Sequence, residues 1–177
     1  TFSNNYYKFN IKGSVIMEEN FINEIDKCQK ISIEEIKNNL NNLDISSIEI
    51  NSGEIWNINN TIINIIFNDY INPIVIKDDE ISETKKLYIN PKWYEDNKEK
   101  CEELIKYICE NINRREFEIE TSKIINTEII DSLCKNKHLE KISLAKYDKE
   151  KYILSETDYK KFKNSTIKKV DTKEVAD

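Results

Sequence analysis

Short apolar segments recur about 25 residues apart in the C-terminal half of the chain. They begin at Phe117, Ile142 and Ile167, and one stretch with helix-like spacing lies in each gap. A strand that recurs every 20 to 29 residues, roughly, with one helix between is typical of solenoid repeats. The strand–helix–strand order therefore predicts parallel neighbouring strands joined by helical crossovers.

One long helix is predicted before the first of these segments. Leu87-Tyr88-Ile89 indicates a strand, and Asn90-Pro91 then provides an N-cap and a proline at the first helical position. Apolar residues follow at intervals of three and four, which indicates one buried face: Cys101, Leu104, Ile105, Ile108, Cys109 and Ile112. We expect parallel neighbouring strands near residues 88, 117, 142 and 167.

Two shorter helices are predicted between the later strands. Thr127 would cap a helix that buries Ile129, Ile130 and Leu133. Ser155 would cap a helix that buries Tyr159 and Phe162.

The N-terminal part of the chain has a less regular pattern. Alternating apolar residues over 7–11 predict a strand with a turn at Gly13, and helical spacing predicts a helix over 18–29. A capping box at Ser32-Ile33-Glu34-Glu35 predicts a second helix. Three or four short strands are expected between Ile45 and Ile76, separated by Asn, Ser, Gly and Pro.

These elements predict an α/β protein with a parallel sheet in its C-terminal half. We expect a single domain over 1–177, with mixed helix and strand (α+β) over 1–80 and repeated strand–helix units over 81–177. The alternative is a compact α/β or α+β domain with a mixed sheet. The missing initial Met and the end of the chain soon after a predicted strand indicate a fragment of a longer protein.

Residues 139–144 carry a family resemblance. Leu139-Glu140-Lys141-Ile142-Ser143-Leu144 matches the L-x-x-L-x-L core of a leucine-rich repeat, and about residues 87–170 resemble an irregular array of such repeats. The pattern departs where Tyr147 takes the asparagine position and where Arg114 and Asn164 take the first apolar position.

The resemblance implies which strand residues face inward and which face a partner. The implied inward residues are Phe117, Ile119, Ile142, Leu144 and Ile167. The implied open sheet face, which in such solenoids binds a protein partner, exposes Glu118, Glu120, Ser143, Ala145 and Lys168.

Charge is unevenly distributed along the chain. The net charge is −6, yet from Cys134 onward twelve lysines face eight acidic residues. Lys160, Lys161, Lys163, Lys168 and Lys169 cluster around Tyr159 and Phe162, which would suit nucleic-acid binding. The acidic chain as a whole opposes that hypothesis.

Several kinds of chemistry have no motif in this sequence. Only Gly13 and Gly53 occur, so glycine-rich nucleotide loops are excluded, and a single His138 excludes paired-histidine metal motifs. We expect no catalytic residue, no metal and no cofactor.

Weaker hypotheses remain for other side chains. One is a Cys134–His138 metal or thiol–imidazole site, and another is a nuclease-like cluster at Glu35/Lys37 or Glu83/Lys85. A third is an aromatic patch of Trp56, Trp93 and Tyr94, although Trp93 and Tyr94 would also seal the long helix against the sheet.

The cellular setting follows from cysteine usage and hydropathy. Four cysteines without C-x-x-C spacing indicate reduced thiols, and no run of about 18 apolar residues occurs. We therefore expect a cytoplasmic, non-catalytic protein-interaction or scaffold module that binds a protein and neither nucleic acid nor membrane. The alternatives are an accessory or regulatory domain of an enzyme, or a nucleic-acid-associated regulator that uses the Lys-rich end.

Overall fold

The computed structural model describes residues 28–50, 73–79, 82–121, 125–146 and 150–176. The predicted strand over 7–11, the turn at Gly13 and the predicted strands at 55–58 and 62–67 lie outside the described residues. Most of the helix predicted over 18–29 lies outside them as well. Its last two residues belong to a strand, Cys28–Lys30, so that part of the prediction is wrong.

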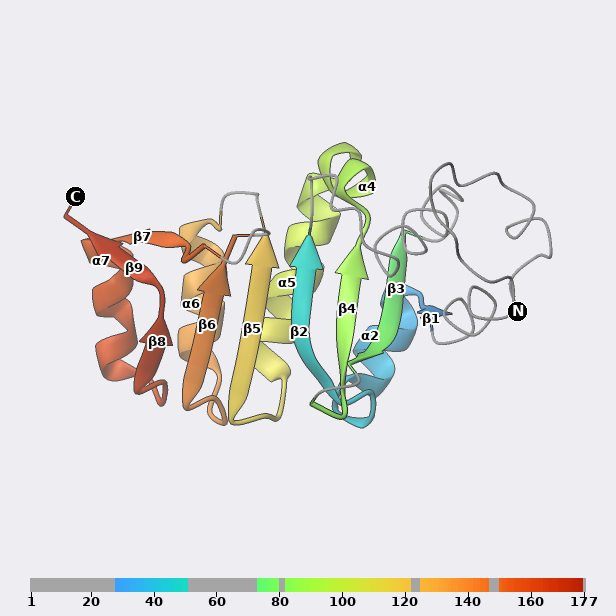
Figure 1. Ribbon diagram of the computed structural model, residues 1–177, viewed down its shortest axis with the longest axis horizontal. Coiled ribbons are helices and arrows are strands. Elements are labelled where there is room, and N and C mark those ends of the chain that lie inside the picture. The colour runs from blue at the N-terminus through green and yellow to red at the C-terminus, as the bar shows by residue number, and fades with distance from the viewer. Residues whose placement is uncertain (1–27, 51–72, 80–81, 122–124, 147–149, 177) are drawn as a thin grey trace, which may run out of the picture.

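A mixed sheet of seven strands forms one layer of the protein (Figure 1). Its order is β1-β3-β4-β2-β5-β6-β8, antiparallel from β1 to β4 and parallel from β4 to β8. The strands are β1 (Cys28–Lys30), β2 (Ile45–Ile50), β3 (Ile74–Asp79), β4 (Thr84–Ile89), β5 (Glu116–Thr121), β6 (Lys141–Ala145) and β8 (Lys169–Asp171). A separate parallel pair, which the sequence pattern did not predict, joins β7 (Ile153–Ser155) to β9 (Lys173–Val175). The predicted α/β class is confirmed, and the strands of the C-terminal half, β5, β6 and β8, pair in parallel as expected.

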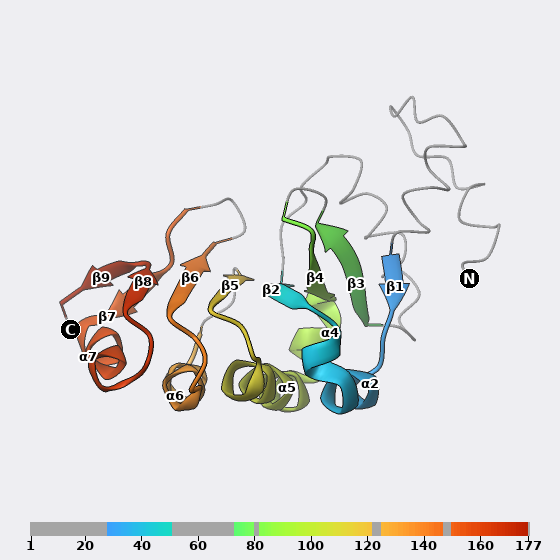
Figure 2. The ribbon, with the colours of Figure 1, turned by 90° about the horizontal axis from the view of Figure 1, so that it is seen from below.

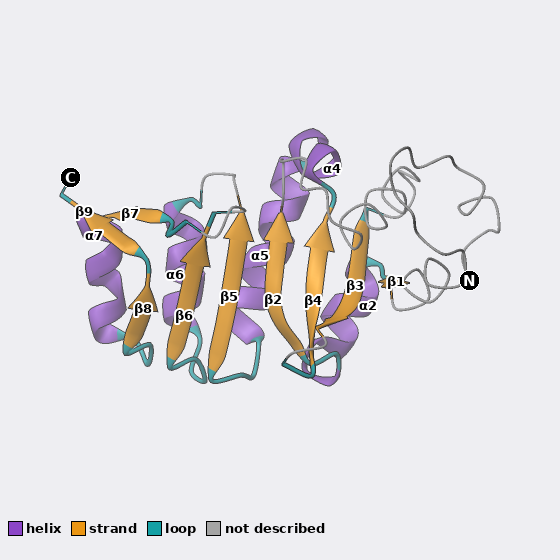
Figure 3. Cartoon of the chain, in the orientation of Figure 1, coloured by secondary structure: helices purple, strands orange, loops and turns teal. Residues whose placement is uncertain are grey.

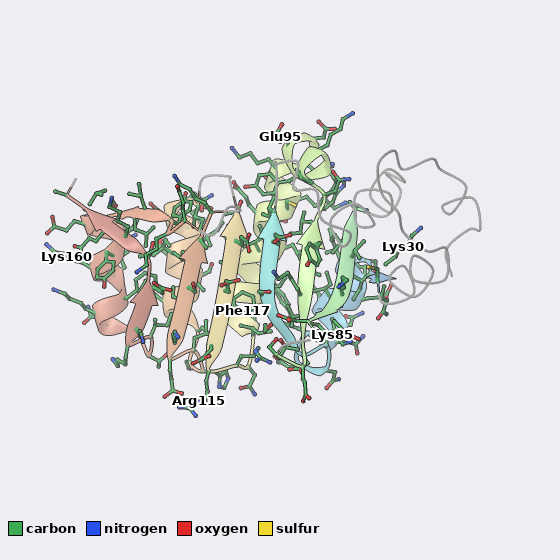
Figure 4. The ribbon with its side chains drawn as sticks, viewed as in Figure 1. Lys30, Lys85, Glu95, Arg115, Phe117 and Lys160 are labelled. Atoms are coloured by element: carbon green, nitrogen blue, oxygen red, sulfur yellow. The ribbon has the colours of Figure 1, made fainter. Side chains whose placement is uncertain are left out.

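The helices form a second layer on one face of the sheet. They are α2 (Ile33–Asn39), α4 (Pro91–Asp96), α5 (Lys98–Asn111), α6 (Thr127–Lys135) and α7 (Glu156–Lys160), with short 3-10 turns η2 (Leu40–Asn42) and η3 (Lys161–Asn164). Seen edge-on, α2, α5, α6 and α7 lie on the same side of the strands (Figure 2). Within the described part of the chain no helix covers the opposite side, which we call the helix-free face (Figures 2 and 3).

Local capping signals place the helix starts. Ser32 accepts the backbone N–H of Glu35 at 3.1 Å, and Ser155 accepts that of Asp158 at 3.2 Å. Asn90 accepts two backbone N–H groups, from Lys92 and Trp93. These three predicted caps are confirmed. The cap of α6 is Asn126 instead of Thr127, because the Asn126 side chain already accepts the N–H of Ile129 and leaves Thr127 as the first helical residue.

The long predicted helix is two helices, α4 and α5, with a break at Asn97. Its φ angle is −132°, and its side-chain amide donates to the carbonyl of Trp93 at 3.2 Å. Asparagine side chains compete with the helical backbone for hydrogen bonds, which accounts for a break at this residue. The predicted apolar stripe of α5 is buried, as is Ile112 directly after it.

The hydrophobic core lies between the sheet and the helices. All five residues expected to face inward are buried: Phe117, Ile119, Ile142, Leu144 and Ile167. Phe162 is buried as expected, whereas Tyr159 is only half-buried.

The expectation that the strands near residues 88 and 117 are neighbours is wrong. β2 lies between β4 and β5 and pairs with both in parallel. Ile45, Ile48 and Ile50 are all buried, and a strand rich in buried β-branched residues suits the middle of a sheet. The crossover through α4 and α5 is long enough to carry the chain past this inserted strand.

The predicted start of the last strand is also wrong. Val170, not Ile167, lies opposite Ile142, which lies opposite Phe117. The Arg115 carbonyl accepts the N–H groups of Glu140 and Lys141, and the Glu140 carbonyl accepts those of Lys168 and Lys169. Lys168 is therefore equivalent to Glu140, and Ile167 takes the place of Leu139, three residues ahead of the first inward strand residue. The extra residues lie before α7, which begins 14 residues after Ile142 at Glu156, whereas α6 begins 10 residues after Phe117 at Thr127.

Candidate interaction surface on the helix-free face

Strand register brings polar side chains into rows across the helix-free face. Since neighbours in a ladder point to the same side, each row follows from the pairing. One row runs Tyr88–Glu49–Glu120–Ala145, the next Lys86–Ser47–Glu118–Ser143–Asp171, and the third Glu116–Lys141–Lys169. Apolar residues alternate with them and face the helices.

A charged cluster lies where β4, β2 and β5 meet. The Lys86 Nζ is 3.7 Å from the Glu49 Oε1 and 4.0 Å from the Glu120 Oε2. These side chains are 17 %, 10 % and 2 % exposed, respectively. Lys86 thus lies within ion-pair distance of two carboxylates that face each other on neighbouring strands. In a buried setting, removal of one such partner leaves charge without compensation.

Tyr88 belongs to the same cluster. Its ring lies below the Lys86 Nζ, with the ammonium 5.8 Å from the ring centroid. Burial raises the pKa of the Tyr88 phenol well above its ordinary value, and the neighbouring Glu49 raises that pKa further. The phenol therefore remains neutral at physiological pH. Lys77 and Cys28, the next residues on this side of the sheet, are buried as well.

The β5–β6–β8 part of the face is more accessible. Glu118, Ser143 and Ala145 are half-buried, and Lys169 is exposed. Within the described ranges the Glu118 carboxylate has no hydrogen bond or ion pair, and small serines flank it on both sides in its row. Asp171, at the end of that row, pairs with Lys151 at 3.1 Å.

The structure brings together four of the five residues predicted for the open face. Glu118 pairs with Ser143, and Glu120 pairs with Ala145. Lys168 does not join them, because it precedes β8 and its Nζ donates to the Ser165 carbonyl at 2.9 Å. Asp171 occupies the row position expected for Lys168. Glu120 is only 1 % exposed, so its predicted exposure is wrong; it lies against the Lys86 cluster.

Sequence reasoning missed Glu49, Lys86 and Tyr88. The alternating patterns Ser47/Glu49 and Lys86/Tyr88 were visible, since each alternates with buried Ile or Leu. They could not be assigned to this face while β2 was expected elsewhere in the fold. Their proximity depends on pairing between strands that are distant in sequence.

Cys134 and His138, the candidate metal or thiol–imidazole pair, lie in different surroundings. Cys134 is half-buried in α6, whereas His138 is exposed beyond the helix end at Asn136. Burial raises the pKa of the Cys134 thiol to about 11. Among residues that the structure describes, no group of three or more His, Cys, Asp and Glu side chains could hold a metal ion.

The charged and aromatic candidates are engaged in structural contacts. Lys85 pairs with Asp78 at 2.6 Å, and Glu35 accepts the Ser32 hydroxyl at 3.1 Å. Of the predicted aromatic patch, Trp56 lies outside the described residues, and Trp93 and Tyr94 are buried, as expected for residues that seal the helix against the sheet. In the Lys-rich end, Lys160 pairs with Glu156, and Lys161 pairs with both Asp131 and Asp158.

A groove also lies on the helix side of the protein. It has a volume of about 420 Å³ and is lined by α5 and α6 residues together with Lys37. Lys106 and Glu128 form an ion pair across it at 3.1 Å, and the Tyr107 hydroxyl donates to the Lys37 carbonyl. The Lys106, Glu128 and Tyr107 side chains of the groove are thus engaged in these contacts.

None of the helices described here is both long and apolar enough to cross a membrane. In comparisons with known proteins, the chain matches no family model, no curated protein and no solved structure.

Proposed function

We propose that this chain is a non-catalytic protein-interaction module of a cytoplasmic protein, built from irregular leucine-rich-repeat-like units over about residues 87–170. Its docking surface is the part of the helix-free face formed by Glu118, Ser143 and Ala145. The observation that carries this proposal is a partly exposed patch in which Glu118 lies beside Ser143, with Ala145 in the next row. Its strands pack on buried Phe117, Ile142 and Leu144.

The repeat-like arrangement rests on three aligned units. Phe117, Ile142 and Val170 are in register, at intervals of 25 and 28 residues along the chain. Leu139 and Ile167 are both buried three residues before the strand residue of their unit. Arg114 is the exception at the corresponding position, where it pairs with Asp44.

The partner that best fits the face is an extended polypeptide segment with a basic side chain. Glu118 supplies a carboxylate, and Ser47 and Ser143 on either side are too small to cover it. An arginine or lysine of the partner can reach Glu118 between these serines and form a charge-assisted hydrogen bond.

The test places a bulky side chain on the face. Ser143→Arg is expected to reduce capture of the partner from native lysate at least tenfold, because the long side chain covers the row and neutralises Glu118. Asn164→Arg is the matched control, since Asn164 is an exposed residue in η3. Captured proteins are then purified, and their binding to both variants is measured directly.

Two results decide the proposal. If the purified partner binds wild type and Asn164→Arg equally and Ser143→Arg poorly, while all three have the same thermal midpoint, the docking surface is supported. If Ser143→Arg binds the partner as wild type does, the helix-free face is not the docking surface.

A further inference from the structure

Two lysines lie side by side on the helix-free face, at the first residues of β6 and β8. Lys141 in β6 is the register partner of Lys169 in β8, so both side chains project from the same side of the sheet. Lys141 is half-buried and Lys169 is exposed. Like charges directly opposite each other on adjacent strands are destabilising.

Among the described residues, Lys141 and Lys169 form no ion pair, whereas several other lysines of this region do. Lys146, Lys151, Lys160 and Lys161 each form an ion pair with a carboxylate. Across the described ranges no carboxylate lies within ion-pair distance of Lys141 or Lys169, although Glu116 is the strand neighbour of Lys141 on its other side. Asp171, two residues from Lys169, is already paired with Lys151.

We propose that Lys141 and Lys169 form a clamp for an acidic side chain of the docked polypeptide. This inference rests on the proposed function and adds the charge pattern of the partner. A carboxylate placed between the two ammonium groups would relieve their repulsion and accept a charge-assisted hydrogen bond from each.

The clamp lies at a fixed separation from Glu118. Lys141 and Ser143 are two residues apart on β6, which corresponds to about 6.6 Å along a strand. Ser143 is in turn the register partner of Glu118. Glu118 also lies one to two strand spacings to the side of the clamp, about 5–10 Å across the sheet. In an extended segment, an acidic and a basic residue two positions apart point to the same side, and their long side chains can bridge this sideways offset to meet the clamp and Glu118.

A protein segment fits this surface better than a nucleic acid. Glu116 and Glu118 project from the same face as the clamp, on the strand next to Lys141. Their carboxylates would repel a continuous phosphate backbone, whereas a peptide can place one acidic side chain at the lysines and a basic one at Glu118.

Fluorescence anisotropy with purified full chain at low ionic strength tests the clamp. The probe is a labelled peptide of three Thr-Glu-Thr-Arg repeats, and its matched probe carries Gln in place of Glu. Lys141→Gln/Lys169→Gln is expected to weaken binding of the Glu-containing peptide about fivefold, the loss expected for two exposed ion pairs, and to leave the Gln-containing peptide within about twofold. Lys137→Gln/Lys163→Gln is the control, because these exposed lysines flank the strands but lie outside the ladder.

Each other outcome overturns the clamp. Equal losses in the two double variants would show a general charge effect, and equal binding of the two peptides to wild type would show no preference for an acidic residue. Tighter binding of an octathymidylate than of both peptides would identify the surface as a nucleic-acid site. If neither peptide binds the wild-type chain, the proposal is also contradicted.

The same assay separates failure of the clamp from failure of the docking surface. If the Gln-containing peptide binds and Ser143→Arg removes that binding, the docking surface stands even when the lysine variants have no effect. If Ser143→Arg leaves the binding of both peptides unchanged, the docking surface itself is wrong.

Discussion

Asn136 has a structural role that its polar side chain alone would not indicate. It is 1 % exposed, and its amide donates to the carbonyls of Cys109 and Ile112 at 3.0 and 2.9 Å. Its side-chain oxygen accepts the N–H groups of His138 and Leu139. One residue thereby joins the end of α5 to the turn that leads into β6.

Asn136→Ala is expected to lower the free energy of unfolding by about 3 kcal/mol, because it leaves several buried backbone groups without a hydrogen-bond partner. Asn164→Ala is the control: Asn164 lies six residues before Val170, just as Asn136 lies six before Ile142, yet it is exposed. The control should change the free energy of unfolding by no more than about 0.5 kcal/mol. Urea denaturation measures both, and similar losses in the two variants would contradict this role.

At the scale of the element, helix caps depend on residues nearby in the sequence, whereas strand register depends on residues far apart. The caps at Ser32, Asn90 and Ser155 depend on residues three or fewer positions away, so the sequence predicts them correctly. The start of β8 depends on where Lys168 and Lys169 meet Glu140, a contact across the turn and the preceding helix. No local pattern determines that register.

Asn90 anchors the first turn of α4 through two backbone hydrogen bonds to one side-chain oxygen. Asn90→Ala is expected to cost about 1–2 kcal/mol in the free energy of unfolding, the usual effect of losing an N-cap. Asn90→Asp keeps an acceptor at the cap and should retain most of the stability. Chemical denaturation of both variants provides the measurement, and an equal loss in Ala and Asp would refute the capping role.

At the scale of the whole molecule, the helix-free face was predictable where strands follow one another in the chain. Glu118 and Ser143 belong to consecutive parallel strands, and their alternation with buried residues placed them correctly. The Lys86 cluster joins β2, β4 and β5, and its assembly depends on the insertion of β2. Alternation determines a side chain's face, whereas the order of strands determines its neighbours.

Because of its buried thiols, the free energy of unfolding of the protein depends on pH in the alkaline range. Burial raises the pKa of Cys101 and of Cys109 to about 12, and Glu102 contributes to the shift of Cys101. Above about pH 9 these thiols ionise in the unfolded chain but remain protonated in the folded one, so protons favour the folded state. The contribution of these two thiols to the free energy of unfolding is thus fully present below about pH 9 and is lost as the pH rises toward 12.

The free energy of unfolding should fall between pH 9 and pH 11 by up to about 1.4 kcal/mol per pH unit for each such thiol. Cys109→Ala should therefore have a shallower decline than wild type, even though the cavity lowers its stability at every pH. Urea titrations at pH 8, 9, 10 and 11 give both slopes. Parallel declines in the two proteins would exclude Cys109 as a source of the pH dependence.

The insertion of β2 between β4 and β5 makes the N-terminal segment an integral part of the sheet. Adjacent strands are about 4.8 Å apart, so without β2 a gap of roughly 10 Å would separate β4 from β5, too wide for their backbones to hydrogen bond directly. A piece of the chain that begins after β2 would expose two strand edges in the middle of the protein. β8 lies at one edge of the sheet and pairs only with β6 within it, whereas the strand at Ile45–Ile50 lies in the centre and connects the two halves through its pairing with β4 and β5.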